Sequence, residues 1–116
     1  DLLQAKIKKV LADEQEICQE DFSIDRLAKL CEATPKDVSQ VINERMGCSF
    51  VLLLSEYRIK EACRRLDDEE NFGRLTLEAI GRSVGFKARE SFSRAFKRVT
   101  GVSPSVYHRR VSERQP

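Results

Sequence analysis

The residues with the most distinctive chemistry lie between positions 87 and 98, where basic and polar side chains recur on one face of an amphipathic run. Apolar residues at positions 92, 95, 96 and 99 share the opposite face, as expected for a helix with one buried side. A guanidinium or amide on the outer face can pair with the edge of a nucleic-acid base, and an ammonium can pair with phosphate. The chemistry that this stretch suggests is therefore recognition of a polyanion.

The candidates for contacts with bases occupy the exposed early part of this helix. Arg94 is our first choice, since a guanidinium can bind O6 and N7 of guanine together, which is worth about 1 to 3 kcal/mol of discrimination. Glu90 can accept a hydrogen bond from N4 of cytosine, and a solvated carboxylate that favours the helix dipole is an equal alternative. The predicted base contacts of this helix are Arg89, Glu90, Ser93, Arg94 and Lys97.

Two helices and a tight turn must position these side chains. Thr76 can cap a short helix, Gly85 breaks that helix, and Gly101 ends the longer one that follows. Ser103 and Pro104 can start a third helix, because serine caps and proline fits the first turn. The stretch is thus predicted to be a helix-turn-helix followed by a further helix.

The chain contains this pattern twice. A shift of 53 residues aligns Phe22–Cys31 with Leu75–Val84, and a shift of 54 residues aligns Val38–Phe50 with Phe92–Pro104. Two units of this length are too few for a solenoid, so we interpret the repeat as a tandem duplication of one helix-turn-helix. The predicted base contacts of the first copy are Lys36, Ser39, Gln40 and Asn43.

The amides of the first copy suit adenine. Gln40 and Asn43 can each pair bidentately with that base, although ordinary exposed polar residues on a helix are the alternative for both. Asp37 more simply caps the helix or repels phosphate.

Phosphate contacts are expected from cationic side chains and from amides at helix starts. Arg109 and Arg110 have a basic tail as their alternative interpretation. Phe86, Phe92 and Phe96 are expected in the core and not as platforms for stacked bases, because they share the apolar face. The predicted phosphate contacts are Lys87, Arg98, Arg109, Arg110 and the helix starts at Ser23, Thr76 and Ser103.

Charge is distributed unevenly along the chain. Residues 1–81 contain 12 Lys and Arg against 17 Asp and Glu, whereas residues 82–116 contain nine against two. This polarity focuses positive potential on the second copy and can steer a polyanion there. The first copy must bind more weakly or use neutral amides.

The whole pattern predicts an all-α fold of about seven helices, with two helix-turn-helix subdomains joined by a long linker helix. The linker helix, about 27 Å long at about 1.5 Å per residue, approaches the roughly 34 Å between successive major-groove faces on one side of B-DNA. No apolar run approaches the roughly 20 residues needed to span a bilayer. The expected segments are an N-terminal helix (1–21), the first helix-turn-helix (22–48), the linker helix (49–66), an acidic loop (67–74), the second helix-turn-helix (75–110) and a frayed tail (111–116).

Other chemistry finds little support. The four cysteines form no CxxC pair and have no nearby histidine, so we expect buried thiols in a reducing cytoplasm, and neither a metal site nor another cofactor. His108 has no evident carboxylate partner and no phosphate-cradling glycine loop occurs, so an enzyme is not expected. A helical protein–protein adaptor that uses the wide apolar surface of Tyr57–Leu66 is the remaining alternative.

Together these motifs resemble the C-terminal DNA-binding domain of the AraC/XylS family of bacterial transcription regulators. The resemblance spans about Phe22–Arg110 and is most specific at Ile80–Phe86, Ser91–Lys97 and Thr100–Tyr107, while Tyr57–Cys63 resembles the family's linker-helix motif. It implies sequence-specific binding of double-stranded DNA, with two recognition helices in adjacent major-groove segments. It also implies a cytoplasmic regulator with RNA polymerase and a sensory or dimerisation region as partners.

The chain departs from the family pattern at three places. Glu32 occupies the turn position that Gly85 has in the second copy, so a non-glycine residue must accept an uncommon backbone angle at a cost of about 1 kcal/mol. Gly81 stands inside a helix where the family usually has alanine, and the acidic linker is a few residues longer than usual. The chain opens at Asp1 without methionine, from which we expect it to be part of a longer protein.

Overall fold

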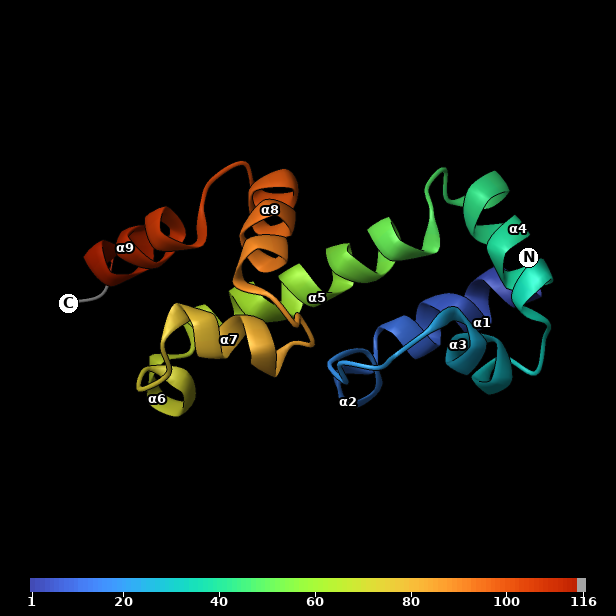
Figure 1. The fold of residues 1–116 in the computed structure, drawn as a ribbon, viewed down its shortest axis with the longest axis horizontal. Helices are drawn as coiled ribbons and strands as arrows, with labels where there is room; N and C mark the ends of the chain where they lie inside the picture. The colour runs from blue at the N-terminus through green and yellow to red at the C-terminus, as the bar shows by residue number, and fades with distance from the viewer. Residues whose placement is uncertain (115–116) are drawn as a thin grey trace.

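The computed structural model describes residues 1–114 and is helical throughout, with short connections. Its longest dimension is 47 Å and the others are 25 and 24 Å, with α1–α4 at one end, α6–α9 at the other and α5 between them (Figure 1). None of these helices is long and apolar enough to cross a membrane. The nine helices of the described residues are α1 (Leu2–Leu11), α2 (Glu14–Ile17), α3 (Ile24–Leu30), α4 (Pro35–Arg45), α5 (Phe50–Asp67), α6 (Glu69–Phe72), α7 (Leu77–Ser83), α8 (Arg89–Thr100) and α9 (Pro104–Arg114).

Hydroxyl-bearing residues begin five of the helices. The side-chain oxygens of Ser23, Thr34, Ser49, Thr76 and Ser103 each accept a hydrogen bond of 3.0 to 3.2 Å from the backbone N–H three residues later. These are N-caps, which satisfy one of the amide groups that a helix start leaves without a partner. Pro35 occupies the first turn of α4, where its missing N–H has no cost.

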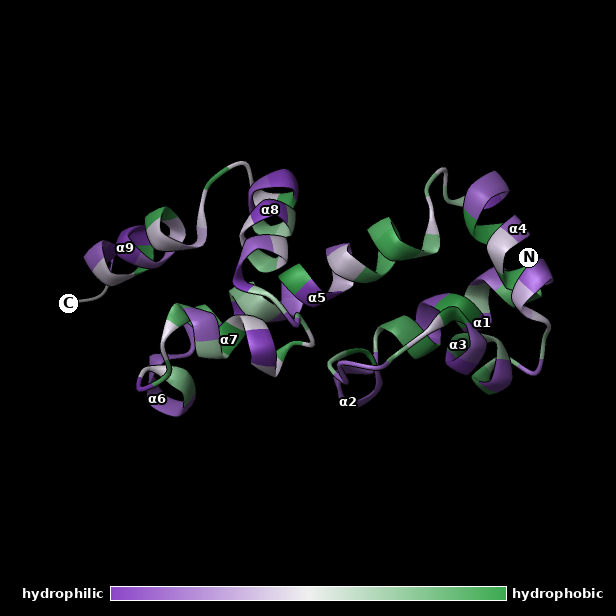
Figure 2. Ribbon diagram, in the orientation of Figure 1, coloured by the Kyte–Doolittle hydropathy of each residue, from purple (hydrophilic) through white to green (hydrophobic). Residues whose placement is uncertain are grey.

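Two separate hydrophobic cores meet along α5. The first contains Leu53 and Leu54 of α5 with residues of α1, α3 and α4, and the second contains Ile59, Ala62 and Leu66 of α5 with residues of α7 and α8. Figure 2 shows hydrophobic residues along the first turns of α5 and hydrophilic bands on α4 and α8. Because α5 belongs to both cores, its apolar residues are spread widely around its circumference.

The two ends of the molecule are joined by polar contacts that radiate from α5. The Arg58 side chain, 8% exposed, donates from Nε to the carbonyl oxygen of Ile17 (2.6 Å) and from Nη2 to that of Gln19 (2.7 Å). Arg65 donates from Nη1 to the carbonyl oxygen of Ser83 (3.1 Å). Since Ile17 and Gln19 precede the first helix-turn-helix and Ser83 lies in the second, α5 holds one half against the other.

A buried carboxylate, that of Glu61, orients the neighbouring arginines. Its oxygens accept two hydrogen bonds from Arg64 (2.9 and 2.7 Å) and one from Nε of Arg65 (2.6 Å). Burial by itself would raise the pKa of Glu61, but the hydrogen bonds from Arg64 and Arg65 outweigh burial and lower this pKa to about 2. Glu61 therefore stabilises the fold in its charged form.

Two expected segments are wrong in detail, because a capping aspartate starts an additional helix in each. Residues 1–21 form two helices in place of one, since the Asp13 carboxylate caps α2. The acidic segment 67–74 is not a simple loop, because Asp68 caps the short helix α6. These two additions account for nine described helices where about seven were expected.

The expected frayed tail, residues 111–116, is also wrong for the part that the structure describes. Helix α9 continues to Arg114, and the side chain of Val111 is 5% exposed. Burial of this valine explains why the helix does not end at residue 110. Residues 115–116 lie outside the described residues.

Gly81 in α7 lies against the ring of Phe92 in α8. A Cβ atom on Gly81 would lie 2.7 Å from both Cγ and Cδ2 of Phe92, well inside van der Waals contact. The ring is 3% exposed and packs between Phe86 and Phe96, at centroid distances of 5.5 and 5.7 Å, so it has little room to move. The glycine, a departure from the family pattern, thus allows α7 and α8 to approach closely.

We expect Glu61→Gln to lower the free energy of unfolding at pH 7 by about 2 to 3 kcal/mol. A carboxyl whose pKa falls on folding, here from 4.5 to about 2, stabilises the fold above the unfolded value and loses this contribution as pH falls toward 2. The free energy of unfolding of the variant should therefore decrease less than that of the unmodified protein as the pH falls between these values. Urea denaturation at a series of pH values measures both effects. In the control Glu56→Gln, which removes only an exposed pair with Lys60, the change should be below about 1 kcal/mol, and equal effects of the two substitutions would contradict the prediction.

We expect Gly81→Ala to destabilise the protein by about 1 to 3 kcal/mol through overpacking, although alanine is about 1 kcal/mol better than glycine inside a helix. Thermal and chemical denaturation measure the change. Arg82→Ala is the matched control, since it introduces an alanine at the next position of the same helix. It removes only an exposed ion pair with Glu78, worth less than about 1 kcal/mol. Unchanged or increased stability of Gly81→Ala would show that α8 can move away from α7 freely.

Candidate nucleic-acid interface

The two helix-turn-helix units close their turns in the same way. Glu32 in the first and Gly85 in the second have positive φ angles of 56° and 107°. In each, the amide of the next residue donates to the carbonyl oxygen five positions earlier, at 2.9 and 3.0 Å. This hydrogen bond is typical of a helix that is followed by a residue in the left-handed conformation, as in the Schellman motif. The uncommon backbone angle expected at Glu32 is confirmed, and the two copies share one turn geometry.

The second helix of each unit, α4 or α8, exposes one face. In Figure 1 both helices run in the same direction, toward the top of the view, with α8 above α5 and α4 beyond the first turn of α5. Their inner faces are buried through Val38 and Ile42 in α4 (both 0% exposed) and through Phe92 and Phe96 in α8 (3% and 0%). These four residues occupy equivalent positions of the repeat. The two helices therefore expose equivalent outer faces to solvent.

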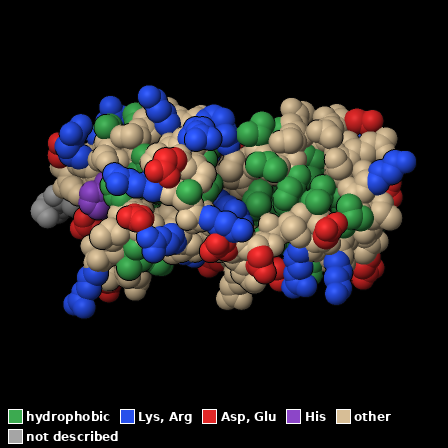
Figure 3. Space-filling model, in the orientation of Figure 1, with side chains coloured by type: hydrophobic (Ala, Val, Ile, Leu, Met, Phe, Trp, Pro, Cys, Tyr) green, Lys and Arg blue, Asp and Glu red, His purple; other side chains and the backbone are tan. Residues whose placement is uncertain are grey.

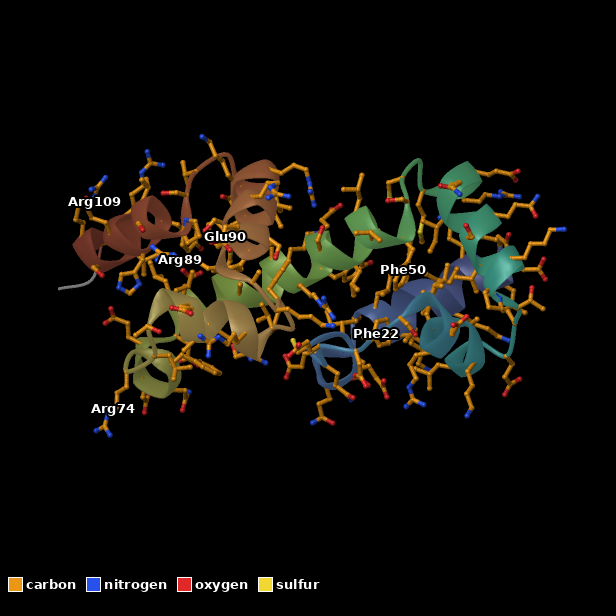
Figure 4. The ribbon with its side chains drawn as sticks, in the orientation of Figure 1. Phe22, Phe50, Arg74, Arg89, Glu90 and Arg109 are labelled. Carbon is orange, nitrogen blue, oxygen red and sulfur yellow. The ribbon has the colours of Figure 1, made fainter. Side chains whose placement is uncertain are left out.

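The outer face of α8 presents most of its predicted base contacts. Arg89 and Glu90 occupy its first turn (Figure 4). Arg89 and Ser93 also line a groove of about 100 Å³ with Ser103, which precedes α9, so the structure brings these three candidates together. Of the five candidates in α8, four are exposed and the last is half-buried: Arg89, Glu90, Arg94, Lys97 and Ser93.

The start of α8 has no side-chain cap, unlike the starts of α3, α4 and α7. Ala88 stands at the cap position and makes no side-chain hydrogen bond. The first amides of α8 therefore lack a side-chain acceptor at the positive end of the helix dipole. We did not predict this feature, although the absence of Ser, Thr, Asp or Asn at position 88 was a signal for it.

The outer face of α4 differs in its charge and local bonding. Lys36, Gln40 and Asn43 are exposed and Ser39 is half-buried. The amide nitrogen of Gln40 donates to Oε1 of Glu44 (3.2 Å), and that of Asn43 donates to Oγ of Ser39 (3.5 Å). This face thus offers amides held by neighbours one turn away, where α8 offers cations.

The cationic phosphate candidates are exposed around α8. Lys87 lies in the turn before α8, and Arg109 and Arg110 lie on α9, where Figure 4 shows Arg109 near the far end of the molecule. On the face in Figure 3, Lys and Arg side chains gather over the end that contains α8 and α9. The positive charge expected for the second copy is therefore concentrated at one end of the structure.

Four other phosphate candidates have partners inside the protein. The hydroxyls of Ser23, Thr76 and Ser103 cap α3, α7 and the start of α9, so that only backbone amides there remain to meet phosphate. Arg98 is exposed overall, but its Nη2 donates to Oγ of Ser55 on α5. This contact connects α8 to the linker helix, a structural role that the sequence did not suggest.

One side of α5 carries buried polar side chains that were not predicted from the sequence. Leu54, Arg58, Glu61 and Arg65 follow the helical spacing i, i+4, i+7, i+11 and so lie on one side of the helix. Arg58 and Glu61 are 8% and 9% exposed. Their phase with Leu54 was the signal that these charges point inward.

The apolar surface that a protein–protein adaptor would use is largely covered. Ile59 and Ala62 are fully buried and Leu66 is 5% exposed, all within the core that α5 shares with α7 and α8. The Tyr57–Leu66 stretch therefore serves the fold and offers little surface to a partner.

Within residues 1–114, no group of His, Cys, Asp and Glu side chains could hold a metal ion. Burial raises the pKa of the Cys18, Cys31 and Cys63 thiols, which disfavours the nucleophilic thiolate. The exposed faces of α4 and α8 remain the candidate site.

Comparisons with known proteins identify the family of this chain. A family model described as a helix-turn-helix domain matches residues 27–110. The arabinose operon regulatory protein of Escherichia coli (strain K12) is 29% identical over 98 residues, which are 84% of this chain and 32% of that protein. Its counterpart in Salmonella typhimurium is 31% identical over 86 residues, 74% of this chain and 29% of that protein. The chain thus spans about a third of the length of these relatives.

Solved structures show the same fold. The C-terminal domain of AraT, a response regulator from Geobacillus stearothermophilus, is 27% identical with a TM-score of 0.74, over 94% of this chain and 84% of that chain. A DNA-binding transcriptional dual regulator from Escherichia coli K-12 has a TM-score of 0.79 over 97% and 94% of the two chains, at 19% identity. The two curated relatives are operon regulatory proteins. The chain belongs to the AraC-type helix-turn-helix family of transcription regulators, whose DNA-binding module it forms.

Proposed function

We propose that the chain binds double-stranded DNA sequence-specifically as the DNA-binding domain of a bacterial regulator, with α4 and α8 in adjacent major-groove segments. The observation that carries this proposal is that the two proposed recognition helices, one in each half of the molecule, run in the same direction (Figure 1). The 18 residues of α5 span about 27 Å, close to the roughly 34 Å that separates major-groove faces on one side of a duplex.

The two recognition helices supply different interactions. In α8, Arg94 is proposed to read guanine, with Arg89, Glu90, Ser93 and Lys97 around it. Its surroundings are basic, so this half should provide most of the salt-dependent affinity.

In α4, Gln40 and Asn43 are proposed to read adenine, assisted by Lys36 and Ser39. The hydrogen bond from Gln40 to Glu44 leaves the amide oxygen of Gln40 available as an acceptor. Because this face is not strongly basic, we assign it sequence discrimination more than affinity.

Phosphate binding is proposed for Lys87, Arg109 and Arg110, together with the amides at the starts of α3, α7, α8 and α9. Arg98 joins them only if its side chain leaves Ser55. We propose RNA polymerase as a further partner, in the cytoplasm. We also propose a sensory or dimerisation region, because the matched part is only about a third of each curated regulator.

We expect Arg94→Ala to weaken binding to a selected site by about 10- to 100-fold and to relax the preference at one base pair, since a bidentate contact to guanine is lost. Lys87→Ala should instead weaken binding to all sequences alike and lower the salt slope by about one unit. Sites are first selected from a random DNA pool at physiological salt. Fluorescence anisotropy with selected and random duplexes, at several salt concentrations, then measures both effects.

The control is Lys9→Ala, which removes an exposed cation of α1, outside both helix-turn-helix units, and should leave both quantities unchanged. Equal losses on selected and random DNA for Arg94→Ala would assign Arg94 to phosphate. Failure of the unmodified chain to retain any duplex would contradict the proposed function itself.

A further inference from the structure

We propose that Arg58 is the positioning residue that sets the orientation of the two recognition helices relative to each other, and so the spacing between the two DNA half-sites that the chain accepts. The part that concerns DNA rests on the proposed function, whereas the part that concerns orientation does not. The inference comes from the contacts of one buried side chain near the middle of α5.

The first set of contacts reaches the N-terminal half. The guanidinium of Arg58 donates to the carbonyl oxygens of Ile17 and Gln19, at 2.6 and 2.7 Å, where α2 ends. No carboxylate of residues 1–114 lies within ion-pair distance of Arg58. A cation that is 8% exposed therefore depends on these two carbonyl groups to offset its loss of water.

The second set of contacts reaches the turn of the C-terminal helix-turn-helix. Cζ of Arg58 lies 5.8 Å from the ring centroid of Phe86, a cation–π contact. A Cβ atom on Gly85 would lie 2.7 Å from the same Cζ atom. Gly85 thus permits both the positive φ of the turn and the approach of the guanidinium. One planar group contacts both halves at once.

These contacts matter because the halves are connected through a single helix. Within the described residues, every extensive contact between the helices of one half and those of the other runs through α5. Arg65 adds a second bridge, donating to the carbonyl oxygen of Ser83 (3.1 Å) with its Nη2 at 3.9 Å from Sγ of Cys18. Without Arg58, each half would keep its own core on α5, but their mutual orientation would lose its central constraint.

For DNA binding, the orientation determines avidity. When one helix-turn-helix is bound, the other meets its half-site intramolecularly, with an effective concentration that depends on how well the connection matches the distance. A rigid connection favours one spacing strongly, and a loose connection accepts several spacings with less affinity for each. Arg58 therefore acts on specificity without touching a base.

The orientation can be tested without DNA by NMR residual dipolar couplings on the intact chain. Couplings from α3–α4 and α7–α8 should fit one alignment tensor in the unmodified protein. In Arg58→Ala, each half should still fit its own structure, but the two halves should need tensors of different magnitude. Lys60→Ala, which removes an exposed cation from the same helix, is the control and should keep one tensor.

A single tensor for Arg58→Ala would overturn the proposal. If that variant does not fold, Arg58→Lys decides the matter, because it keeps the charge and the stem but one ammonium cannot span both carbonyl oxygens and lie on Phe86. A single tensor for Arg58→Lys would then overturn the proposal in the same way.

The DNA arm compares duplexes that carry both selected half-sites at the selected spacing or with one or two base pairs inserted. The unmodified chain should lose affinity by about tenfold or more when the spacing changes, whereas Arg58→Ala should bind the different spacings within about threefold of one another. Undiminished spacing discrimination in Arg58→Ala would overturn the proposal. If the unmodified chain binds no duplex, the proposed function fails, and the dipolar couplings still decide whether Arg58 orients the halves.

Discussion

The arrangement of this molecule depends most on the contacts of the Arg58 guanidinium with both halves. Removing a cation from water is costly unless hydrogen bonds and other favourable contacts replace the lost hydration. The replacements here are two carbonyl oxygens from the N-terminal half and an aromatic ring from the C-terminal half. Because the partners come from both halves, the cost is fully offset only when both halves are in place, which couples their relative position to the stability of the fold.

The same contact explains an asymmetry between two otherwise equivalent turns. Glu32 and Gly85 both have positive φ angles and the same closing hydrogen bond. Glu32 is exposed, so a side chain there meets only the local backbone cost of about 1 kcal/mol. At Gly85 a side chain would also collide with Arg58. The second copy therefore needs glycine for a tertiary reason that the first copy does not share.

The candidate DNA surface follows from this arrangement. Each of the helices α4 and α8 is held by its own core, so its outer residues are exposed whatever the other half does. Facing a common duplex is different, because it requires α5 to hold α4 and α8 in a fixed relative orientation, and in the structure both run in the same direction (Figure 1). In the proposed function, the basic end around α8 and the amide-bearing face of α4 are two parts of one interface, with affinity concentrated in the first and discrimination shared between them.

Local sequence patterns were enough to predict the helices of the two helix-turn-helix units and α5, together with the inward faces of α4 and α8, because these depend on interactions within about four residues. The exposure of Arg94 and Gln40 follows from their phase relative to Phe92 and Val38. The helix α6, of four residues, was missed because one turn shows no periodicity, and the break between α1 and α2 was missed because the apolar spacing continues across it. The roles of Arg58 and Arg98 could not be predicted in this way, because their hydrogen-bond partners lie 39 to 43 residues away in the chain. Contacts at that separation leave no local pattern, since they form only when the two cores bring distant residues to the same stretch of α5.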